Sequence, residues 1–418
     1  MKVLHISTYD THGGAAKATY KLHNELLRQG IESKMLVRFK YSKDDTVIEF
    51  KPANNIFSKL VRLIRRFIIK KNVQKYQFNY DAYEIYHDDS SDLKSGFEKY
   101  IDSQTIINLH WVAGFIDYKS FLIKFSKTNQ IYWRLADMNP LTGGCHYDFD
   151  CNKFMTGCGK CPQFFKNAGK DITNQSWKRK SKNFSKVPSE NLHFICLSKW
   201  MAEKLAEHPF FNKFTLSIIP NGIEPTFFNS RNKDASKIAL NILPTTKTIV
   251  LIANSLESKI KGMQFAIDAL NKSIQSNNFF VLLVGKMTNT DLLKFPHYHF
   301  GEVSDKLLLS TIYNAADIFL FTSIQDNFPN TALEAIACGT PVVGFATGGI
   351  VDIVENNVDG LLTSEFSSES LSKLIHIIFS DNDKMNELQK CCATKAKTLF
   401  NINLQAQRYI ELYKKFKK

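Results

Sequence analysis

The stretch DNFPNTALEAIACGTPVV, which begins at Asp326, contains two carboxylates whose spacing could hold a ligand. Asp326 and Glu334 lie eight positions apart on either side of Pro329, a residue suited to open a helix. Eight residues make a little over two helical turns, so the two acids can grip opposite ends of one ligand. Asn330 and Thr331 follow the proline, and the free N–H groups of such a first turn form a cradle for an anion.

A nucleotide-sugar fits these groups, because its diphosphate suits the N–H cradle and its vicinal hydroxyls donate to carboxylates. The alternative is a core helix, in which Ala332, Leu333, Ile336 and Ala337 face a sheet. In that case the acids gain only about 0.3–1 kcal/mol from the helix dipole. The core helix explains the apolar positions but leaves the polar ones unexplained.

Length and composition describe a globular chain of about two to three domains. The chain has 418 residues, of which 44% are hydrophobic and 22% charged, and a formal net charge of +14. That charge attracts polyanions, but no platform of interleaved aromatic and basic residues indicates a nucleic-acid partner. The start, MKVLHISTYD, lacks a signal-peptide layout, and no apolar run reaches the ~18–20 residues of a membrane span. A cytoplasmic location is expected.

Short apolar runs alternate with helical periodicity along the chain, which predicts an α/β fold with parallel sheets. The segment IIPNGIEP interrupts this rhythm at Pro220 to Pro225, after which it restarts with KTIVLIAN. We therefore expect two doubly wound, Rossmann-like domains, residues 1–219 and 220–397, that face each other across a cleft. The amphipathic tail, residues 398–418, is expected to be a helix that packs back on the first domain.

The segment from Asp326 to Glu334 resembles the E-x7-E signature of family 4 retaining glycosyltransferases of the GT-B fold. The surroundings are similar as well, with NAADIFLFTS before it and CGTPVVGFATGGIVDIVENNVDGLL after it. The resemblance is strongest from about Asn221 to Leu362, and it departs at Asp326, which is one methylene shorter than the family's glutamate. It implies that a sugar moves, with retention, from a UDP- or GDP-sugar to a hydroxyl of a glycan or lipid-linked acceptor. Surface polysaccharide biosynthesis is the expected setting, and no catalytic metal is expected.

The resemblance also implies the roles of individual residues. Asp326 would contact the donor sugar, Asn330 and Thr331 the phosphates, and Glu334 the ribose hydroxyls, while Lys261 would neutralise the departing diphosphate. Asn254 or Lys259 stands where the family has an arginine. The complete donor-binding set is Gly13, Gly14, Asn254, Lys259, Lys261, Asp326, Asn327, Phe328, Asn330, Thr331 and Glu334, and the catalytic set is His110, Asp326 and Lys261.

The N-terminal half offers fewer candidates. Gly13 and Gly14 lie between a strand-like and a helix-like segment, where they form either a simple turn or a close approach to a ligand. They do not complete G-x-G-x-x-G, which disfavours a NAD-dependent oxidoreductase. His110 ends the strand-like TIINLH and resembles the family's histidine beside the transferred sugar, although a lone histidine is more often structural. Asp137 ends another strand and is an acceptor-side candidate.

Four of the eight cysteines lie within seventeen positions: Cys145, Cys151, Cys158 and Cys161. Disulfides are not expected in a cytoplasmic chain, whereas the CGKC sequence and two further thiols suit a structural zinc ion. His146 is an alternative ligand. Such a closed site would brace the acceptor loop and take no part in catalysis.

Residues 56–76, IFSKLVRLIRRFIIKKNVQKY, carry seven basic residues and no acid. At helical spacing one face is apolar and the opposite face is basic: Phe57, Leu60, Val61, Ile64 and Ile68 against Lys59, Arg62, Arg65, Arg66 and Lys70. This pattern predicts either peripheral membrane contact at the inner face or a core-packed helix with a basic outer face.

Two other functions share the same architecture. A sugar-nucleotide epimerase would release a changed donor without any acceptor, and a non-catalytic protein would only bind the nucleotide-sugar. Incubation with nucleotide-sugars and a lipid-linked acceptor separates both from a transferase.

Overall fold

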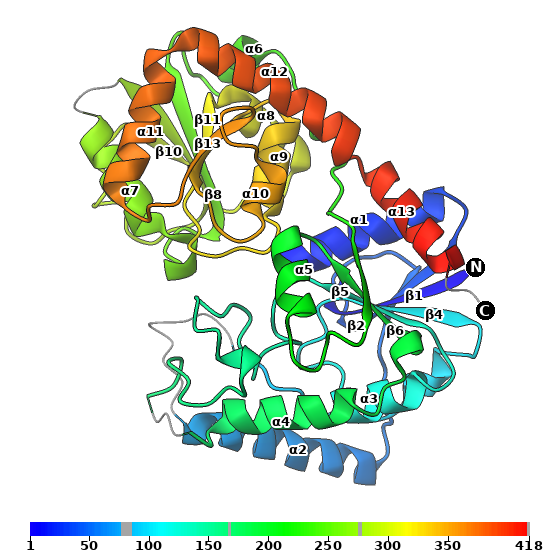
Figure 1. The fold of residues 1–418 in the computed structure, drawn as a ribbon. Helices are drawn as coiled ribbons and strands as arrows, with labels where there is room; N and C mark the ends of the chain where they lie inside the picture. Colours follow the sequence, from blue (N-terminus) through cyan, green and yellow to red (C-terminus); the bar gives the residue numbers. More distant parts are fainter. Residues whose placement is uncertain (77–85, 166–168, 275–277, 416–418) are drawn as a thin grey trace. The chain divides into compact units, whose positions relative to one another are not determined.

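The computed structural model describes residues 1–76, 86–165, 169–274 and 278–415, and these form two compact units (Figure 1). The N-terminal unit comprises Met1–Pro220 and the C-terminal segment from Gln405. The C-terminal unit comprises Asn221–Leu404. The sequence had placed the change of domain at residue 220 and the return at residue 398.

The N-terminal unit is built on a seven-stranded sheet of order β3-β2-β1-β4-β5-β6-β7, in which every pair is parallel. The three neighbouring interior strands β4, β5 and β6 are buried along their whole length, as expected for a sheet covered on both faces. The strands are β1 (Lys2–Tyr9), β2 (Glu32–Phe39), β3 (Val47–Glu49), β4 (Thr105–Leu109), β5 (Ile131–Leu135), β6 (Leu192–Cys196) and β7 (Thr215–Ile218).

Helices cover both faces of this sheet, with α1 on one side and α3 and α4 on the other (Figure 1). Several begin at a side chain that accepts a backbone N–H, as Asp117 does for α3, Asp171 for α4 and Ser198 for α5. The helices are α1 (Gly14–Arg28), α2 (Ile56–Lys75), α3 (Tyr118–Phe125), α4 (Ile172–Phe184) and α5 (Lys199–Ala206), with short 3-10 turns η1 (Phe97–Lys99), η2 (Lys153–Met155) and η3 (Ser189–Asn191).

The C-terminal unit has a six-stranded parallel sheet of order β10-β9-β8-β11-β12-β13. Its strands are β8 (Lys247–Ser255), β9 (Phe279–Lys286), β10 (His297–His299), β11 (Ile318–Phe321), β12 (Val342–Phe345) and β13 (Gly360–Thr363). Figure 1 shows α7 and α11 on one side of this sheet and α8 and α9 on the other. The helices are α6 (Lys233–Ala239), α7 (Met263–Ser273), α8 (Lys306–Ala315), α9 (Asn330–Ala337), α10 (Ile350–Ile353), α11 (Ser368–Ser380) and α12 (Asn382–Leu399), with the 3-10 turn η4 (Lys259–Lys261).

The tail helix begins at Ile402 and not at the expected residue 398. α12 ends at Leu399 and α13 runs over Ile402–Lys415. The break arises because Ile223 N–H donates to Phe400 O and Ile402 N–H donates to Ile223 O, at 2.7 and 3.0 Å. A short extended segment therefore pairs with the chain at Ile223 and separates the helices.

From Gln405 onward α13 packs on the N-terminal sheet. Tyr409 and Tyr413 are fully buried there, and the Tyr413 ring meets Tyr132 edge to face. Asn108 of β4 donates to the Tyr413 hydroxyl at 2.6 Å. Burial of these aromatic rings attaches the end of the chain to the sheet.

The two tyrosines provide a matched test of this attachment. Tyr413→Phe leaves the buried Asn108 amide without its acceptor, so we expect the free energy of unfolding to fall by about 1–3 kcal/mol. The Tyr409 hydroxyl has no hydrogen-bond partner among the described residues, so Tyr409→Phe should leave stability nearly unchanged. Urea-induced unfolding measures both changes. Equal effects of the two substitutions would contradict the assignment.

Candidate functional site

In the C-terminal unit the chain runs from β8 to β9 and β10 in one direction, then returns to place β11 on the other side of β8. Ligands of doubly wound sheets bind at this reversal, beyond the carboxyl ends of the two strands. The segment after β8 contains Lys259 and Lys261, and the segment after β11 contains Asp326. The topology therefore brings the candidates from both segments to one edge of the sheet.

Backbone contacts join the loops at this edge. Thr322 donates through its hydroxyl to Lys261 O at 2.8 Å, and Ile324 N–H donates to Ile260 O at 2.8 Å. Gly262 has φ +62°, and a Cβ there would lie 1.9 Å from Thr322 O. Only glycine allows the two loops to approach so closely.

The loop after β12 holds the same segment from the other side. Gly349 N–H donates to Asp326 O at 2.9 Å, and Thr347 donates through its hydroxyl to Ile324 O at 2.6 Å. Gly348 has φ +55°, and a Cβ there would lie 2.0 Å from Asp326 O. The sequence motif included this TGG segment, but its role in holding the Asp326 loop was not foreseen.

Lys261 and Asp326 form an ion pair, with 2.8 Å between Nζ and Oδ2. The Asp326 side chain is 13% exposed and the Lys261 side chain 33% exposed. The pair therefore presents an ammonium group that donates hydrogen bonds next to a carboxylate that accepts hydrogen bonds from hydroxyl groups. Two of the three residues assigned to catalysis from the sequence are thus in direct contact.

Helix α9 begins at Asn330, and its N-cap residue Pro329 makes no side-chain hydrogen bond to the first turn. Asn330, Thr331 and Glu334 are partly exposed, whereas the other five residues of the helix are buried. Positions i, i+1 and i+4 share one face, so the three polar residues are the part of α9 that a ligand can reach. The expected packing of α9 on a sheet therefore holds for its five buried residues and not for the three polar ones.

Glu334 is positioned by a residue that the sequence did not single out. The Tyr313 hydroxyl donates to Glu334 Oε2 at 3.2 Å, and burial raises the pKa of Tyr313 well above its ordinary value. The phenol therefore remains a proton donor to the carboxylate. Asn330 is also held, because its Oδ1 accepts from Asn221 Nδ2 at 3.1 Å.

The remaining donor-side candidates divide into exposed and buried residues. Asn254 and Lys259 are exposed at the end of β8 and in η4. Asn327 and Phe328 are buried, and the Phe328 ring packs edge to face on Phe400. The Phe328 side chain is thus part of the packing of the unit.

In the N-terminal unit the strand order reverses between β1 and β4. Gly13 has φ +85° and precedes α1, which begins at Gly14, and a Cβ at Gly13 would meet no atom within 4 Å. Asp10, at the end of β1, accepts N–H groups of Thr11, Tyr41 and Ser42. Burial acts to raise the pKa of Asp10, but these hydrogen bonds outweigh it and the pKa is lowered. Asp10 was not foreseen from the sequence.

His110 follows β4 and is buried against another histidine. Its Nε2 lies 2.8 Å from Nδ1 of His5. Burial holds the pKa of both imidazoles well below the ordinary value, so both are neutral at neutral pH. In this position His110 can exchange hydrogen bonds but cannot supply a positive charge.

Asp137 follows β5 and lines the same small pocket as His110, together with Trp111 and Tyr118. Its Oδ2 accepts from Trp111 Nε1 at 2.8 Å and lies 2.5 Å from Nδ1 of His146. Burial acts to raise the pKa of Asp137, but the nearby His146 and the hydrogen bonds outweigh it and lower the pKa.. The catalytic candidate His110 and the acceptor-side candidate Asp137 therefore line one pocket within one unit.

None of the residues of helix α2 is buried. The core-packed alternative for this helix is therefore wrong. Of the basic face, Arg62 and Arg65 are partly buried, whereas Lys59, Arg66 and Lys70 are exposed. Arg65 pairs with Asp117 at 3.0 Å, and Arg66 pairs with Asp92 at 2.6 Å. The apolar side chains are exposed, from 39% for Val61 to 87% for Ile56. No helix in the described part of the chain is long and apolar enough to cross a membrane.

Comparison with known proteins places the C-terminal unit in a family. The family model for glycosyl transferases group 1 matches residues 234–397, which include Lys261, Asp326 and α9. The chain carries a group 1 glycosyltransferase domain.

The relatives of this chain include glycosyltransferases named for bacterial glycan synthesis. The chain is 31% identical over 193 residues to the N,N'-diacetylbacillosaminyl-diphospho-undecaprenol alpha-1,3-N-acetylgalactosaminyltransferase of Campylobacter jejuni, across 45% of this chain and 50% of the relative. It is 21% identical over 374 residues to the putative colanic acid biosynthesis glycosyl transferase WcaC of Escherichia coli K12, across 85% and 86% of the two chains. The chain spans about half the length of the first two curated relatives it matches.

Solved structures show the fold of the whole chain. Anabaena Alr3699/HepE in complex with UDP-glucose superposes with a TM-score of 0.63 at 15% identity, covering 99% of this chain and 100% of that chain. Sucrose-phosphate synthase of Thermosynechococcus elongatus gives a TM-score of 0.66 at 17% identity, covering 99% of each chain. The GT-B fold class expected from the sequence is confirmed.

Two glycine substitutions test the contact that holds the Asp326 loop. Gly348→Ala places a methyl group against Asp326 O, whereas Gly301→Ala meets no atom within 4 Å although Gly301 has a similar φ of +67°. Both pay the cost of the left-handed backbone, so we expect Gly348→Ala to be more destabilising by about 1–3 kcal/mol. Thermal and urea unfolding measure the difference. If the two variants were equally stable, the loop would not depend on this contact.

Proposed function

We propose that the protein is a retaining glycosyltransferase that moves a sugar from a nucleoside-diphosphate sugar to a hydroxyl of a glycan or lipid-linked acceptor. The observation that carries the proposal is the polar face of α9 beside the Lys261–Asp326 pair, within a group 1 glycosyltransferase domain. The UDP-glucose complex of the structurally similar Anabaena protein supports the choice of donor class.

The diphosphate is assigned to the first turn of α9, where backbone N–H groups and the helix dipole favour anions. Lys261 faces the same edge of the sheet and offsets the charge that grows on the leaving diphosphate. Donors fixed before the reaction stabilise such a charge without reorganisation during bond cleavage. Catalytic metal chemistry is not needed for this assignment.

The hydroxyl groups of the donor are assigned to the two carboxylates. Glu334, held by Tyr313, accepts from the ribose, and Asp326 accepts from the sugar. The acceptor hydroxyl would attack from the face that the diphosphate leaves, and its proton would pass to a leaving phosphate oxygen. The acceptor is assigned to the N-terminal unit, where His110 and Asp137 line one pocket. The neutral His110 would support hydroxyl groups by hydrogen bonding.

Substitution of Glu334 tests the donor assignment. Loss of hydrogen bonds to an ionised group costs about 1.5–3 kcal/mol, so Glu334→Ala should lower kcat/KM by about ten- to a hundredfold or more. Glu334→Gln keeps an oxygen that accepts from the Tyr313 hydroxyl, so the local fold is retained while the negative charge is lost. A loss of activity in this variant therefore reports lost ligand contact and not lost folding. Glu387→Ala, on an exposed face of α12 in the same unit, is the matched control.

The assay incubates full-length protein with UDP- and GDP-sugars and an undecaprenyl-diphosphate-linked glycan, and follows product mass and anomeric configuration by NMR. A lipid-linked product with retained configuration supports the proposal. A changed donor formed without acceptor would instead identify an epimerase, and binding without turnover a nucleotide-sugar-binding protein. Undiminished turnover by Glu334→Ala would refute the site.

We further propose that the protein works at the cytoplasmic face of a membrane, with the outward face of α2 in contact with anionic lipid. The large exposed side chains lie on the outer side of a helix fixed to the unit by Arg65 and Arg66, and they include Phe57, Leu60, Leu63, Ile64 and Phe67. Lys59, Lys70, Lys71 and Lys75 are exposed along the same helix. An apolar face flanked by lysines suits the boundary between acyl chains and anionic headgroups. A relative named for a diphospho-undecaprenol substrate and one named for colanic acid biosynthesis support a lipid-linked acceptor.

Vesicle co-sedimentation tests this contact. The wild-type chain should sediment with vesicles of phosphatidylglycerol and phosphatidylethanolamine, and more weakly with phosphatidylcholine. Each basic residue near the surface contributes about 1 kcal/mol, so Lys70→Glu with Lys71→Glu should weaken binding more than tenfold. Leu63→Ser with Phe67→Ser should also release the protein, whereas Leu243→Ser, an equally exposed leucine of the C-terminal unit, should not. Binding unchanged in both double variants would remove the membrane contact.

A further inference from the structure

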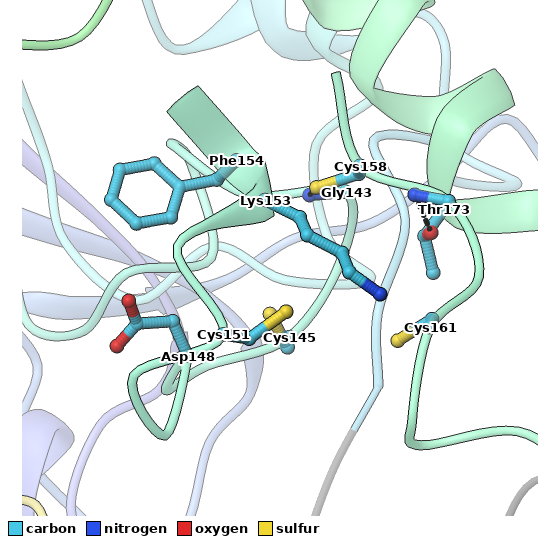
Figure 2. Close-up of a pocket in the computed structure, with 10 residues that line it drawn as sticks. Gly143, Cys145, Asp148, Cys151, Lys153, Phe154, Cys158, Cys161 and Thr173 are labelled. Atoms are coloured by element: carbon cyan, nitrogen blue, oxygen red, sulfur yellow. Dashed lines mark hydrogen bonds between the residues drawn. The ribbon is translucent and has the colours of Figure 1, made fainter. Parts of the chain in front are cut away.

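The structure gathers the four clustered cysteines around one small pocket. They lie in the segment between β5 and α4, and the backbone path of this segment brings all four to the pocket. All four are free thiols, and Figure 2 shows their side chains around the pocket with Lys153 among them. The four cysteines are Cys145, Cys151, Cys158 and Cys161.

The CGKC sequence forms a tight turn with an unusual backbone. Cys158, Gly159 and Lys160 all have positive φ, of 44°, 113° and 45°. Side chains at positive φ are strained, and such strain persists only where the surrounding structure holds it. At Gly159 a Cβ would lie 2.4 Å from Gly169 O, so this position requires glycine. The turn places Cys158 and Cys161 on the same side, toward the pocket (Figure 2).

The first turn of α4 fixes this geometry. Asp171, the N-cap residue, accepts from Cys161 N–H at 2.9 Å, and Thr173 accepts from Gly159 N–H at 3.0 Å. Asn174 donates to Cys158 O at 3.1 Å. The turn is therefore held by side chains of the protein itself, independently of any ligand.

The surroundings of the sulfur atoms favour thiolates once a cation is present. Gly143 N–H donates to Cys158 Sγ at 3.2 Å. Lys180 is fully buried beneath the loop, donates to Asn139 O and Thr142 O, and lies close enough to attract Cys145 and Cys158. A bound metal ion displaces the thiol protons and is held by the thiolates.

We propose that the four cysteines bind one zinc ion as a closed tetrahedral site. Zinc prefers four thiolates at about 2.3 Å, and a closed set of ligands characterises structural sites. Four thiolates and Zn²⁺ carry two net negative charges, which the neighbouring Lys153 and Lys180 offset. As the side chains stand, no three His, Cys, Asp or Glu residues of the described chain are already at metal-binding distances, so binding requires the thiols to turn about χ1 into the pocket.

His146, the alternative ligand, does not line this pocket. Its Nδ1 lies 2.5 Å from Asp137 and its Nε2 lies 3.0 Å from His87. Both ring nitrogens are thus engaged on the other side of the loop, which leaves the zinc ligands as sulfur only.

The site has a structural consequence beyond the loop. Cys161 packs in a small apolar cluster with Phe164 and Ile172, against which Val73 and Tyr76 at the end of α2 lie. Zinc would therefore brace the attachment of α2 as well as the loop. This inference stands independently of the proposed transferase activity.

Metal analysis of the full chain tests the proposal. Protein expressed in zinc-supplemented medium and kept reduced should contain about one zinc ion per chain by plasma mass spectrometry. Cys145→Ser, Cys151→Ser, Cys158→Ser and Cys161→Ser should each lose it, while Cys391→Ser, an exposed cysteine of α12, should retain it. Zinc far below one per chain in the folded wild type, or unchanged zinc in the four variants, overturns the proposal.

Two measurements on the wild-type chain cover variants that fail to fold. Exchange with Co²⁺ should give the thiolate charge-transfer and tetrahedral ligand-field bands of a sulfur-only site. Thiol titration after denaturation in a chelator without reductant should detect all eight cysteines. Absence of the cobalt bands, or fewer than eight thiols because two of the four are joined as a disulfide, also overturns it.

Discussion

The polar groups of the C-terminal unit keep their positions because three loops pack backbone to backbone at the point where the strand order reverses. Gly262 touches Thr322 O, and Gly348 touches Asp326 O, at distances that exclude any side chain. Closely packed interiors allow few alternative arrangements, so a loop that is packed on both sides keeps one conformation. Asp326 is consequently fixed by its main chain, and its carboxylate meets Lys261 without relying on the strength of a partly exposed ion pair.

Local patterns in the sequence were sufficient to predict the parallel α/β architecture, the start of α9 at the residue after Pro329 and the polar face of that helix. These features depend on residues close together in the chain, where periodicity and capping preferences act. The contacts that position the site are of another kind. His5 meets His110 across 105 positions, and Tyr313 meets Glu334 from a different helix. The spacing of residues along the chain does not indicate which buried polar groups face one another. These contacts therefore cannot be predicted from a single sequence.

For helix α2 the sequence predicts an apolar and a basic face, but it does not determine which face packs against the unit. Its apolar and basic faces were recognisable, and a core-packed helix would have buried the apolar one. Buried carboxylates on the unit bear on the orientation, because Asp117 pairs with Arg65 and Asp92 pairs with Arg66. Arg38 also pairs with Asp92, at 2.9 Å, so the acid is shared between the body of the unit and the helix. These ion pairs attach α2 to the unit through two arginines and leave the apolar face to whatever surrounds the protein.

The segment after β5 links the parts of the N-terminal unit that carry different roles. It contains Asp137, which lines the pocket with His110, and a few residues later the first of the four cysteines. Lys180 ties the intervening backbone to α4 through Asn139 O and Thr142 O. Because the backbone between Asp137 and Cys145 is held at both ends, an ion that fixes the cysteines also limits the positions open to Asp137. The proposed zinc ion would thus shape the pocket of His110 and Asp137 through the main chain without lying in it.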